Sequence, residues 1–237
     1  MRRTAAGIVA GLIAGSLFIA GNADATVRTA PTVHIDNVDP TNTARIGVQR
    51  GHLTFEITSD ASQVTLTLTP PTGTSPNQWR VLPGHQDGQK WTFHAIFRKS
   101  APAGTWLATA TATSGGESST DKTTVYTSYR SRISQFRVHP RIVREGKPIY
   151  FSGRLEYNVN GRWKPLANTT VTIFAREDRK VDVDTTTDGR GRFYTWTTAA
   201  TSDLFFAYYH GVNVGGTDAP IETTEADKVP VKVLPKK

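Results

Sequence analysis

Hydrophobic and polar residues alternate along much of the chain with a period of two. Val64, Leu66 and Leu68 alternate with threonines, and a later run places Trp91 and Phe93 on one face of a second segment. A period of two puts alternate side chains on opposite faces of a β-strand, so that one face is buried and the other meets water. After residue 25, no window of about 11 residues shows the apolar stripe of an amphipathic helix. The pattern therefore predicts an all-β fold.

Turn-forming residues divide the chain into short predicted strands. In the first half these strands are expected at 32–38, 52–57, 64–69, 78–82, 91–97, 105–113 and 122–127. In the second half they are expected at 133–138, 149–157, 170–176, 180–186, 192–198, 204–209 and 229–234. Seven short strands in about 100 residues are typical of an antiparallel β-sandwich. We therefore predict two tandem sandwich domains, 26–127 and 128–237, with a long loop over 212–228 before the last strand.

Five motifs follow one another in the second half. They are FSGRL at 151–155, GRWKPL at 161–166, VTI at 171–173, TTDGRGRF at 186–193 and FAYYHG at 206–211. This order resembles the bacterial immunoglobulin-like domains that are strung along secreted proteins, and TTDGRGRF is also similar to transthyretin-like and carboxypeptidase-regulatory-like domains. The first half resembles the same class through PAGTW at 102–106. The resemblance implies two tandem antiparallel immunoglobulin-like β-sandwiches, with Trp163 buried at its hairpin position.

The chain contains no cysteine. The disulfide of antibody-type domains is therefore absent, and thiolate metal sites and cysteine nucleophiles are excluded. Only 37% of the residues are hydrophobic and the mean hydropathy is −0.37, which excludes a multispanning membrane protein. The core of each domain must therefore be held by packing alone.

The first 25 residues have the pattern of a secretory signal peptide. Arg2 and Arg3 precede an apolar stretch over 5–20, and Ala23-Asp24-Ala25 forms a small-x-small cleavage site. A membrane anchor is the alternative, but the stretch is shorter than the roughly 20 residues that span a bilayer and contains three glycines. The paired arginines also suggest a twin-arginine signal, although the context expected after the pair is missing. We predict cleavage after Ala25 and a secreted, extracellular protein without a transmembrane anchor in its mature form.

Motifs of the common catalytic classes are missing from the chain. It has no GxSxG, HExxH, GxxxxGK[ST] or strand-linked GxGxxG, and its six histidines lack metal-ligand spacing. Glycoside hydrolysis would need two carboxylates in one cleft, and candidates are Glu145, Glu156, Asp36 and Asp87. We predict a non-catalytic binding or structural protein that acts at the cell envelope or in the extracellular matrix. A polysaccharide-active enzyme and a loop-mediated extracellular inhibitor or effector are the alternatives.

Positive charge is concentrated where the two predicted domains meet. Residues 26–127 carry 8 basic and 7 acidic side chains, whereas residues 128–237 carry 18 and 12. The predicted basic strip consists of Arg130, Arg132, Arg137, Arg141, Arg144 and Lys147, with Glu145 as its one acidic member. Such a strip on a secreted protein indicates an anionic cell-wall polymer, an acidic polysaccharide or phospholipid headgroups. Nucleic acid is not favoured, because no binding motif is present, and a role in solubility alone is the alternative.

Two further groups of residues are candidate binding sites. Tyr194 and Trp196 share one face of a predicted strand, and together with Tyr209 they could form an outward aromatic platform for a sugar ring. A contact between sheets or domains is the alternative for these rings. Calcium is the one cofactor considered, at Asp182, Asp184 and Asp188, although the third aspartate comes two positions later than in a calcium loop.

Cleavage of the signal peptide gives the first testable prediction. Protein recovered from the culture medium should begin at Thr26 when its N-terminus is sequenced, because the small residues at 23 and 25 suit signal peptidase. A chain that stays with the membrane and retains Met1 would contradict it.

Overall fold

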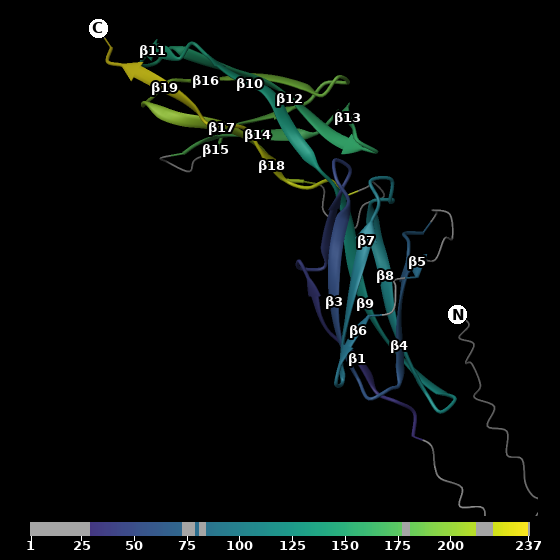
Figure 1. Cartoon of the computed structure of the whole chain (residues 1–237). Helices are drawn as coiled ribbons and strands as arrows, with labels where there is room; N and C mark the ends of the chain where they lie inside the picture. The colour runs from purple at the N-terminus through teal and green to yellow at the C-terminus, as the bar shows by residue number, and fades with distance from the viewer. Residues whose placement is uncertain (1–28, 73–78, 81–83, 177–180, 212–219, 237) are drawn as a thin grey trace, which may run out of the picture.

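Two β-sandwiches lie end to end in the structure, which is a computed structural model (Figure 1). It describes residues 29–72, 79–80, 84–176, 181–211 and 220–236. The predicted signal peptide lies outside these residues. Every described regular element is a strand, and no helix in these ranges is long and apolar enough to cross a membrane.

Domain 1 consists of two sheets. One has the order β1-β3-β7-β6, built from Val33–Asp39, Gly51–Ser59, Lys90–Phe97 and His85–Asp87. The other has the order β2-β9-β8-β4-β5, built from Thr43–Ile46, Glu117–Tyr129, Gly104–Ser114, Gln63–Thr69 and Trp79–Arg80.

Domain 2 repeats this plan. Its first sheet has the order β10-β12-β13, from Ser131–His139, Pro148–Val159 and Arg162–Pro165, and β16 (Arg192–Thr198) also pairs with β12. Its second sheet has the order β11-β19-β17-β14-β15, from Ile142–Arg144, Val229–Leu234, Asp203–Tyr209, Thr170–Ala175 and Val181–Thr186. The short strand β18 (Thr224–Glu225) pairs with β17.

The strand order identifies both domains as immunoglobulin-like. When the main strands of domain 1 are lettered along the chain, the first sheet has the spatial order A-B-E-D and the centre of the second sheet has the order G-F-C, as in immunoglobulin sandwiches. In each domain the initial strand is split between the two sheets, and its second part pairs in parallel with the last strand. A cis proline, Pro40 or Pro140, lies at each of these crossings. The predicted fold class, two tandem antiparallel immunoglobulin-like sandwiches, is confirmed.

The alternating residues of the strands form two separate hydrophobic cores. In domain 1, Trp106 is fully buried, its ring meets Phe97 edge-on at 5.1 Å, and its Nε1 donates to Thr127 Oγ1 at 2.9 Å. In domain 2, Phe151 and Phe205 pack between the sheets with ring centroids 5.3 Å apart. The two cores meet at Tyr129, which packs against both. Burial on alternate positions, as the sequence pattern indicates, therefore accounts for the cores without any disulfide.

Two expectations about domain 2 need correction. The predicted loop over 212–228 is structured in its described part, because Ile221 is buried and bridges Tyr129, and Ala226 is buried beside β18. Residues 212–219 lie outside the described residues. Trp163 is only half-buried and lies beneath the Arg132 guanidinium, 4.1 Å from its ring centroid, because β13 pairs beyond the end of β16.

The packing of Gly153 gives a stability prediction. A Cβ at this position would come within 2.4 Å of Phe193 Cζ, at the outer end of a buried ring. Gly153→Ala should therefore lower the free energy of unfolding of domain 2 by about 1–3 kcal/mol through overpacking. Gly189→Ala is the matched control, because a Cβ there would meet nothing within 4 Å. Urea denaturation followed by circular dichroism measures both, and equal effects would contradict this account.

Candidate binding face on domain 2

The outer surface of the β10-β12-β16 sheet carries aromatic and basic side chains in register. Tyr150 pairs with Trp196, Ser152 with Tyr194 and Arg154 with Arg192, while β10 places Arg137 opposite Ser152 and His139 opposite Tyr150. Alternate residues of paired strands point to the same side, so these side chains share one surface. We call it the aromatic–basic face, defined by Tyr150, Tyr194, Trp196, Arg137, Arg154 and Arg192.

Three aromatic side chains cover the end of this face that is far from domain 1. Tyr194 and Trp196 are 64% and 57% exposed, and Tyr150 is 36% exposed. The rings of Tyr150 and Tyr194 are stacked, with centroids 6.0 Å apart and planes 18° from parallel. Large rings exposed together on a sheet mark a candidate contact surface, because burying them against a partner gains more than leaving them in water.

Tyr209 does not belong to this platform, and its prediction as a member is wrong. It lies on β17 in the opposite sheet, where its position in the alternation points it into the core, and it is 2% exposed. Burial raises the pKa of its hydroxyl to about 12. Tyr150 is the third ring instead, and the sequence alone did not indicate it because the pairing of β12 with β16 joins segments about 45 residues apart.

A hollow of about 610 Å³ lies beside the aromatic rings. It forms where a β-bulge between Ser134 and Arg137 interrupts the pairing of β10 with β12, with Gln135 at a φ of 56°. Arg137 and Arg192 line it from opposite strands, and Tyr194 lines it next to the platform. The extra residue of the bulge keeps both Ser134 and Arg137 on the outer side of the sheet, so the guanidinium of Arg137 stays on this face.

Two carboxylates accompany the arginines of the face, and both are engaged within the protein. Asp188 lines the hollow, and its Oδ1 accepts hydrogen bonds from the backbone N–H of Arg192 and of Arg190, both at 2.8 Å. These two bonds hold the pKa of Asp188 below its ordinary value. Glu156 is 5% exposed, and its Oε2 accepts from Arg132 Nε at 2.9 Å and from Ser134 Oγ at 3.0 Å.

Glu156 also holds one arginine of the face in position. Arg154 Nη1 lies 3.5 Å from Glu156 Oε1, and Arg154 Nε donates to the carbonyl of Arg190 at 3.2 Å. A buried carboxylate is stable only when it is paired and hydrogen-bonded, so its cations stay close to it. Arg137 and Arg192 thus remain the arginines of the hollow that an outside anion meets first.

The six cations of the predicted basic strip do not form one surface. Arg130 is half-buried at the junction of the domains, Arg132 lies between Glu156 and Trp163, and Arg137 belongs to the aromatic–basic face. Arg144 is exposed on β11 in the other sheet, and Arg141 and Lys147 are exposed in the segments before and after β11, at the end of domain 2 far from domain 1. An extended strand advances about 3.3 Å per residue and then crosses to the second sheet, which spreads neighbours in sequence along the whole domain.

The residues considered for calcium are committed to local hydrogen bonds where they are described. Asp184 Oδ1 accepts from Thr172 Oγ1 at 2.6 Å, and Asp188 caps its turn as stated above. The side chain of Asp182 lies outside the described residues. Among the side chains that are described, no three carboxylates or imidazoles gather closely enough to hold a metal ion. Calcium binding over 182–188 stays a prediction from the sequence.

A second group of rings lies on the outer side of the opposite sheet. Phe174 stacks on Phe206 at 5.6 Å, and Tyr208 meets His210 edge-on at 4.7 Å. Lys228 Nζ lies 5.5 Å from the Phe206 ring centroid. These rings are turned toward one another, and the three larger ones are half-buried, so they offer less open ring surface than Tyr194 and Trp196.

Glu222 occupies the junction between the domains. Its Oε2 lies 2.9 Å from Arg45 Nε, across the boundary from domain 1. Burial raises the pKa of Glu222, and the neighbouring Arg45 and Arg130 oppose that rise. Such a carboxyl contributes fully to the stability of the fold at a pH below its pKa in the unfolded chain. This contribution is lost as the pH rises through its pKa in the folded protein.

Comparison with known proteins gives similar structures and no matching family. No family model and no curated protein matches the chain. Similar solved structures include a tetra-tandem repeat from the extending region of a large adhesion protein (16% identity, TM-score 0.32, 86% of this chain and 49% of that chain). Others are the ICAM-5 ectodomain fragment (11%, 0.37, 88% and 52%) and FdeC, an Escherichia coli adhesin (12%, 0.37, 86% and 64%).

The chain spans about half the length of the first two of these structures. TM-scores at this level carry no inference about function. The class of the protein, a tandem immunoglobulin-like β-sandwich protein, rests on its own strand order.

The opposite pKa shifts of Asp188 and Glu222 can be tested directly. Carbon-detected NMR of the side-chain carboxyls should show Asp188 titrating below its ordinary pKa and Glu222 above it, because backbone N–H groups stabilise the first anion and burial disfavours the second. As the pH falls through its folded value, Asp188 should stop stabilising the fold. Arg45→Gln should raise the pKa of Glu222 further. Titration of both groups at ordinary values would refute these environments.

Proposed function

We propose that the protein is a non-catalytic extracellular binding protein whose second domain holds an acidic polysaccharide on the aromatic–basic face. The observation that carries this proposal is the exposed platform of Tyr150, Tyr194 and Trp196 directly beside Arg137 and Arg192. An acidic polysaccharide presents two matching features in each repeat, the C–H face of a sugar ring and an anionic group.

Each half of the face suits one of these features. Tyr and Trp offer large, rigid ring surfaces on which the C–H side of a sugar ring can stack. An arginine guanidinium presents parallel donors that match a carboxylate or sulfate bidentately, and it remains charged at every physiological pH. A neutral glycan would leave Arg137 and Arg192 without a partner, and a polyanion without rings would leave the platform unused.

The state of the carboxylates supports holding a glycan over cleaving it. Glycoside hydrolysis requires a proton-donating acid and a second free carboxylate on either side of the bond. On this face Asp188 accepts two backbone hydrogen bonds and its pKa is lowered, so it is a poor proton donor. Glu156 is buried among Arg132, Arg154 and Ser134. The N-terminal pattern supports placing this binding outside the cell, at the envelope or in its matrix.

Binding to polygalacturonate tests the proposal, with its fully methyl-esterified form as the uncharged control. The chain 26–237 should bind the acid form and lose affinity steeply as salt rises, because the Debye length falls from about 10 Å at 0.1 M to about 3 Å at 1 M. Trp196→Ala should weaken binding about tenfold, equivalent to about 1.4 kcal/mol. Isothermal titration calorimetry measures both effects.

A charge-matched pair of variants separates the face from general basicity. Arg137→Gln with Arg192→Gln should weaken binding at least as much as Trp196→Ala, whereas Lys90→Gln with Lys122→Gln removes the same charge from exposed positions of domain 1 and should change it little. Equal losses of affinity in the two double variants would show that binding depends on net charge alone. If the chain binds phosphatidylglycerol vesicles but not the polymer, the ligand of this face is a membrane surface and not a glycan.

A further inference from the structure

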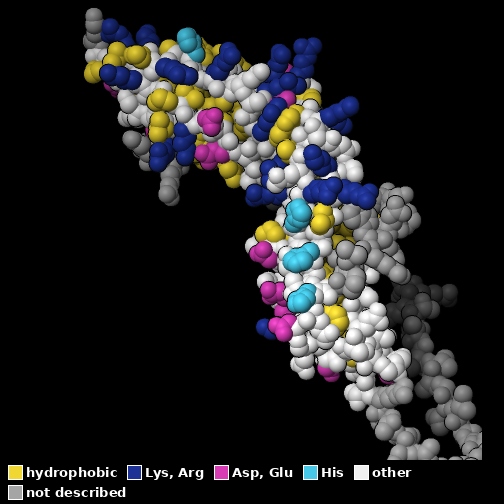
Figure 2. All heavy atoms as spheres, viewed as in Figure 1, with side chains coloured by type: hydrophobic (Ala, Val, Ile, Leu, Met, Phe, Trp, Pro, Cys, Tyr) yellow, Lys and Arg dark blue, Asp and Glu magenta, His cyan; other side chains and the backbone are white. Residues whose placement is uncertain are grey.

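Four cations of domain 1, Arg45, Arg50, Arg98 and Lys99, lie at the end of that domain that meets domain 2. Arg50, Arg98 and Lys99 line a hollow of about 350 Å³, and its wall on the other side is Asn160 from the β12–β13 hairpin of domain 2. Figure 2 shows dark-blue basic side chains over domain 2 and at the junction, whereas acidic and histidine side chains colour the visible side of domain 1 farther away. Domain 1 carries almost no net charge, so this concentration comes from placement and not from composition.

The two walls of this hollow are fixed relative to each other by the backbone. Arg130 is the single residue between β9 and β10; its N–H donates to the carbonyl of Ile46 at 3.3 Å, and its carbonyl accepts from Asn158 N–H at 2.8 Å. A Cβ at Gly47 would come within 2.5 Å of the carbonyl oxygen of Asn158, so the domains are in tight contact there. Arg50 and Asn160 therefore face one hollow as parts of a fixed junction.

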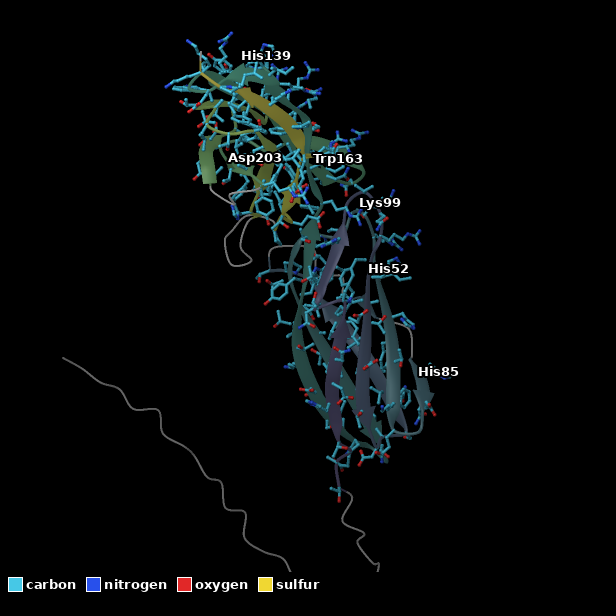
Figure 3. The ribbon with its side chains drawn as sticks, turned by 90° about the vertical axis from the view of Figure 1, so that its left-hand side faces the viewer. His52, His85, Lys99, His139, Trp163 and Asp203 are labelled. Atoms are coloured by element: carbon cyan, nitrogen blue, oxygen red, sulfur yellow. The ribbon has the colours of Figure 1, made fainter. Side chains whose placement is uncertain are left out.

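The space between this hollow and the aromatic–basic face is also basic and aromatic. The Arg132 guanidinium lies 4.1 Å from the Trp163 ring centroid, and the side chain of Arg132 is 45% exposed. Figure 3 labels Trp163 at the edge of domain 2 that adjoins Lys99 of domain 1. From Tyr150 to Asn158, β12 advances by eight residue steps, about 26 Å at 3.3 Å per residue.

We infer that a linear acidic polysaccharide bound to the aromatic–basic face continues along β12, passes Arg132 and Trp163, and crosses the junction onto Arg50 and Lys99 of domain 1. This inference rests on the proposed function and adds a second contact region on the other domain. Its ligand must be a polymer, because a short oligosaccharide on the platform ends before it reaches the junction. The fixed junction makes the second contact intramolecular, so affinity rises once the chain of sugars is long enough to span both regions.

Two acidic side chains near the junction end of the route do not block it. Glu156 is buried beneath Arg132 and Arg154. Glu222 lies in a separate hollow of about 760 Å³ between the domains, where it is paired with Arg45. Arg50 lines both hollows, so the basic surface is continuous around the junction.

Size-fractionated polygalacturonate tests the inference on the chain 26–237. Arg50→Gln with Lys99→Gln should lower the affinity for long polymer about tenfold at low salt and reduce the salt dependence of binding, because two contacts with the polyanion are lost. The same variant should bind a tetramer as the unmodified chain does. Lys90→Gln with Lys122→Gln is the charge-matched control, since both lysines are exposed and lie farther from the junction on β7 and β9. Thermal unfolding of each variant checks that its fold is intact.

The outcomes separate this inference from the proposed function. If Trp196→Ala weakens binding but Arg50→Gln with Lys99→Gln does not, the glycan site is confined to domain 2 and the inference fails alone. The contact at the junction is refuted if Arg50→Gln with Lys99→Gln loses no more affinity for the polymer than Lys90→Gln with Lys122→Gln. It is also refuted if Arg50→Gln with Lys99→Gln weakens the binding of tetramer and polymer equally. If the unmodified chain binds neither polymer nor tetramer, the proposed function fails and the inference with it.

Discussion

The pairing of β12 on both of its edges is the constraint on which the candidate site depends. β12 bonds to β10 along one edge and to β16 and then β13 along the other, so its outward residues are held between two neighbours at every level. A shift of one residue in this register would turn Tyr194 and Trp196 into the core and bring Phe193 out. Phe193 lies over Gly153, where a side chain would clash, and this fit selects the observed register. The surface chemistry is thus a consequence of core packing on the other side of the same strands.

The junction extends this order from one domain to two. Its single residue, Arg130, donates its backbone N–H to Ile46 of domain 1 and accepts at its carbonyl from Asn158 of domain 2, and Tyr129 packs against both cores. The segment around Ile221, between β17 and β18, returns to the boundary and forms a β-bridge with Tyr129. Part of this long connection therefore stabilises the junction. Buried backbone groups need partners, and here the partners come from both domains. A surface that crosses the boundary can therefore keep its shape.

The strands themselves follow from the sequence with few errors, because alternation reports burial locally. The pattern Val64, Leu66, Leu68 predicts a half-buried strand, and these residues are buried on β4. Short strands such as β2, β11 and β18 were not predicted, because two to four residues are too few to show a period. Tyr209 was predicted to be exposed and Trp163 to be buried, and both predictions failed for one reason. Each depended on which sheet the residue joins, and spacing along one strand does not contain that information.

The sequence by itself determined the class of the protein, the absence of any disulfide and two of the three rings on the platform. Only the tertiary structure decided which residues share a surface. It separated Arg137 from Arg141 and Arg144, joined it to Arg192 and Tyr150, and brought Arg50 and Lys99 to the edge of the other domain. The physical reason is that alternation is a property of one strand and its burial, whereas a binding surface is made by hydrogen-bonded register between strands that are far apart in the chain.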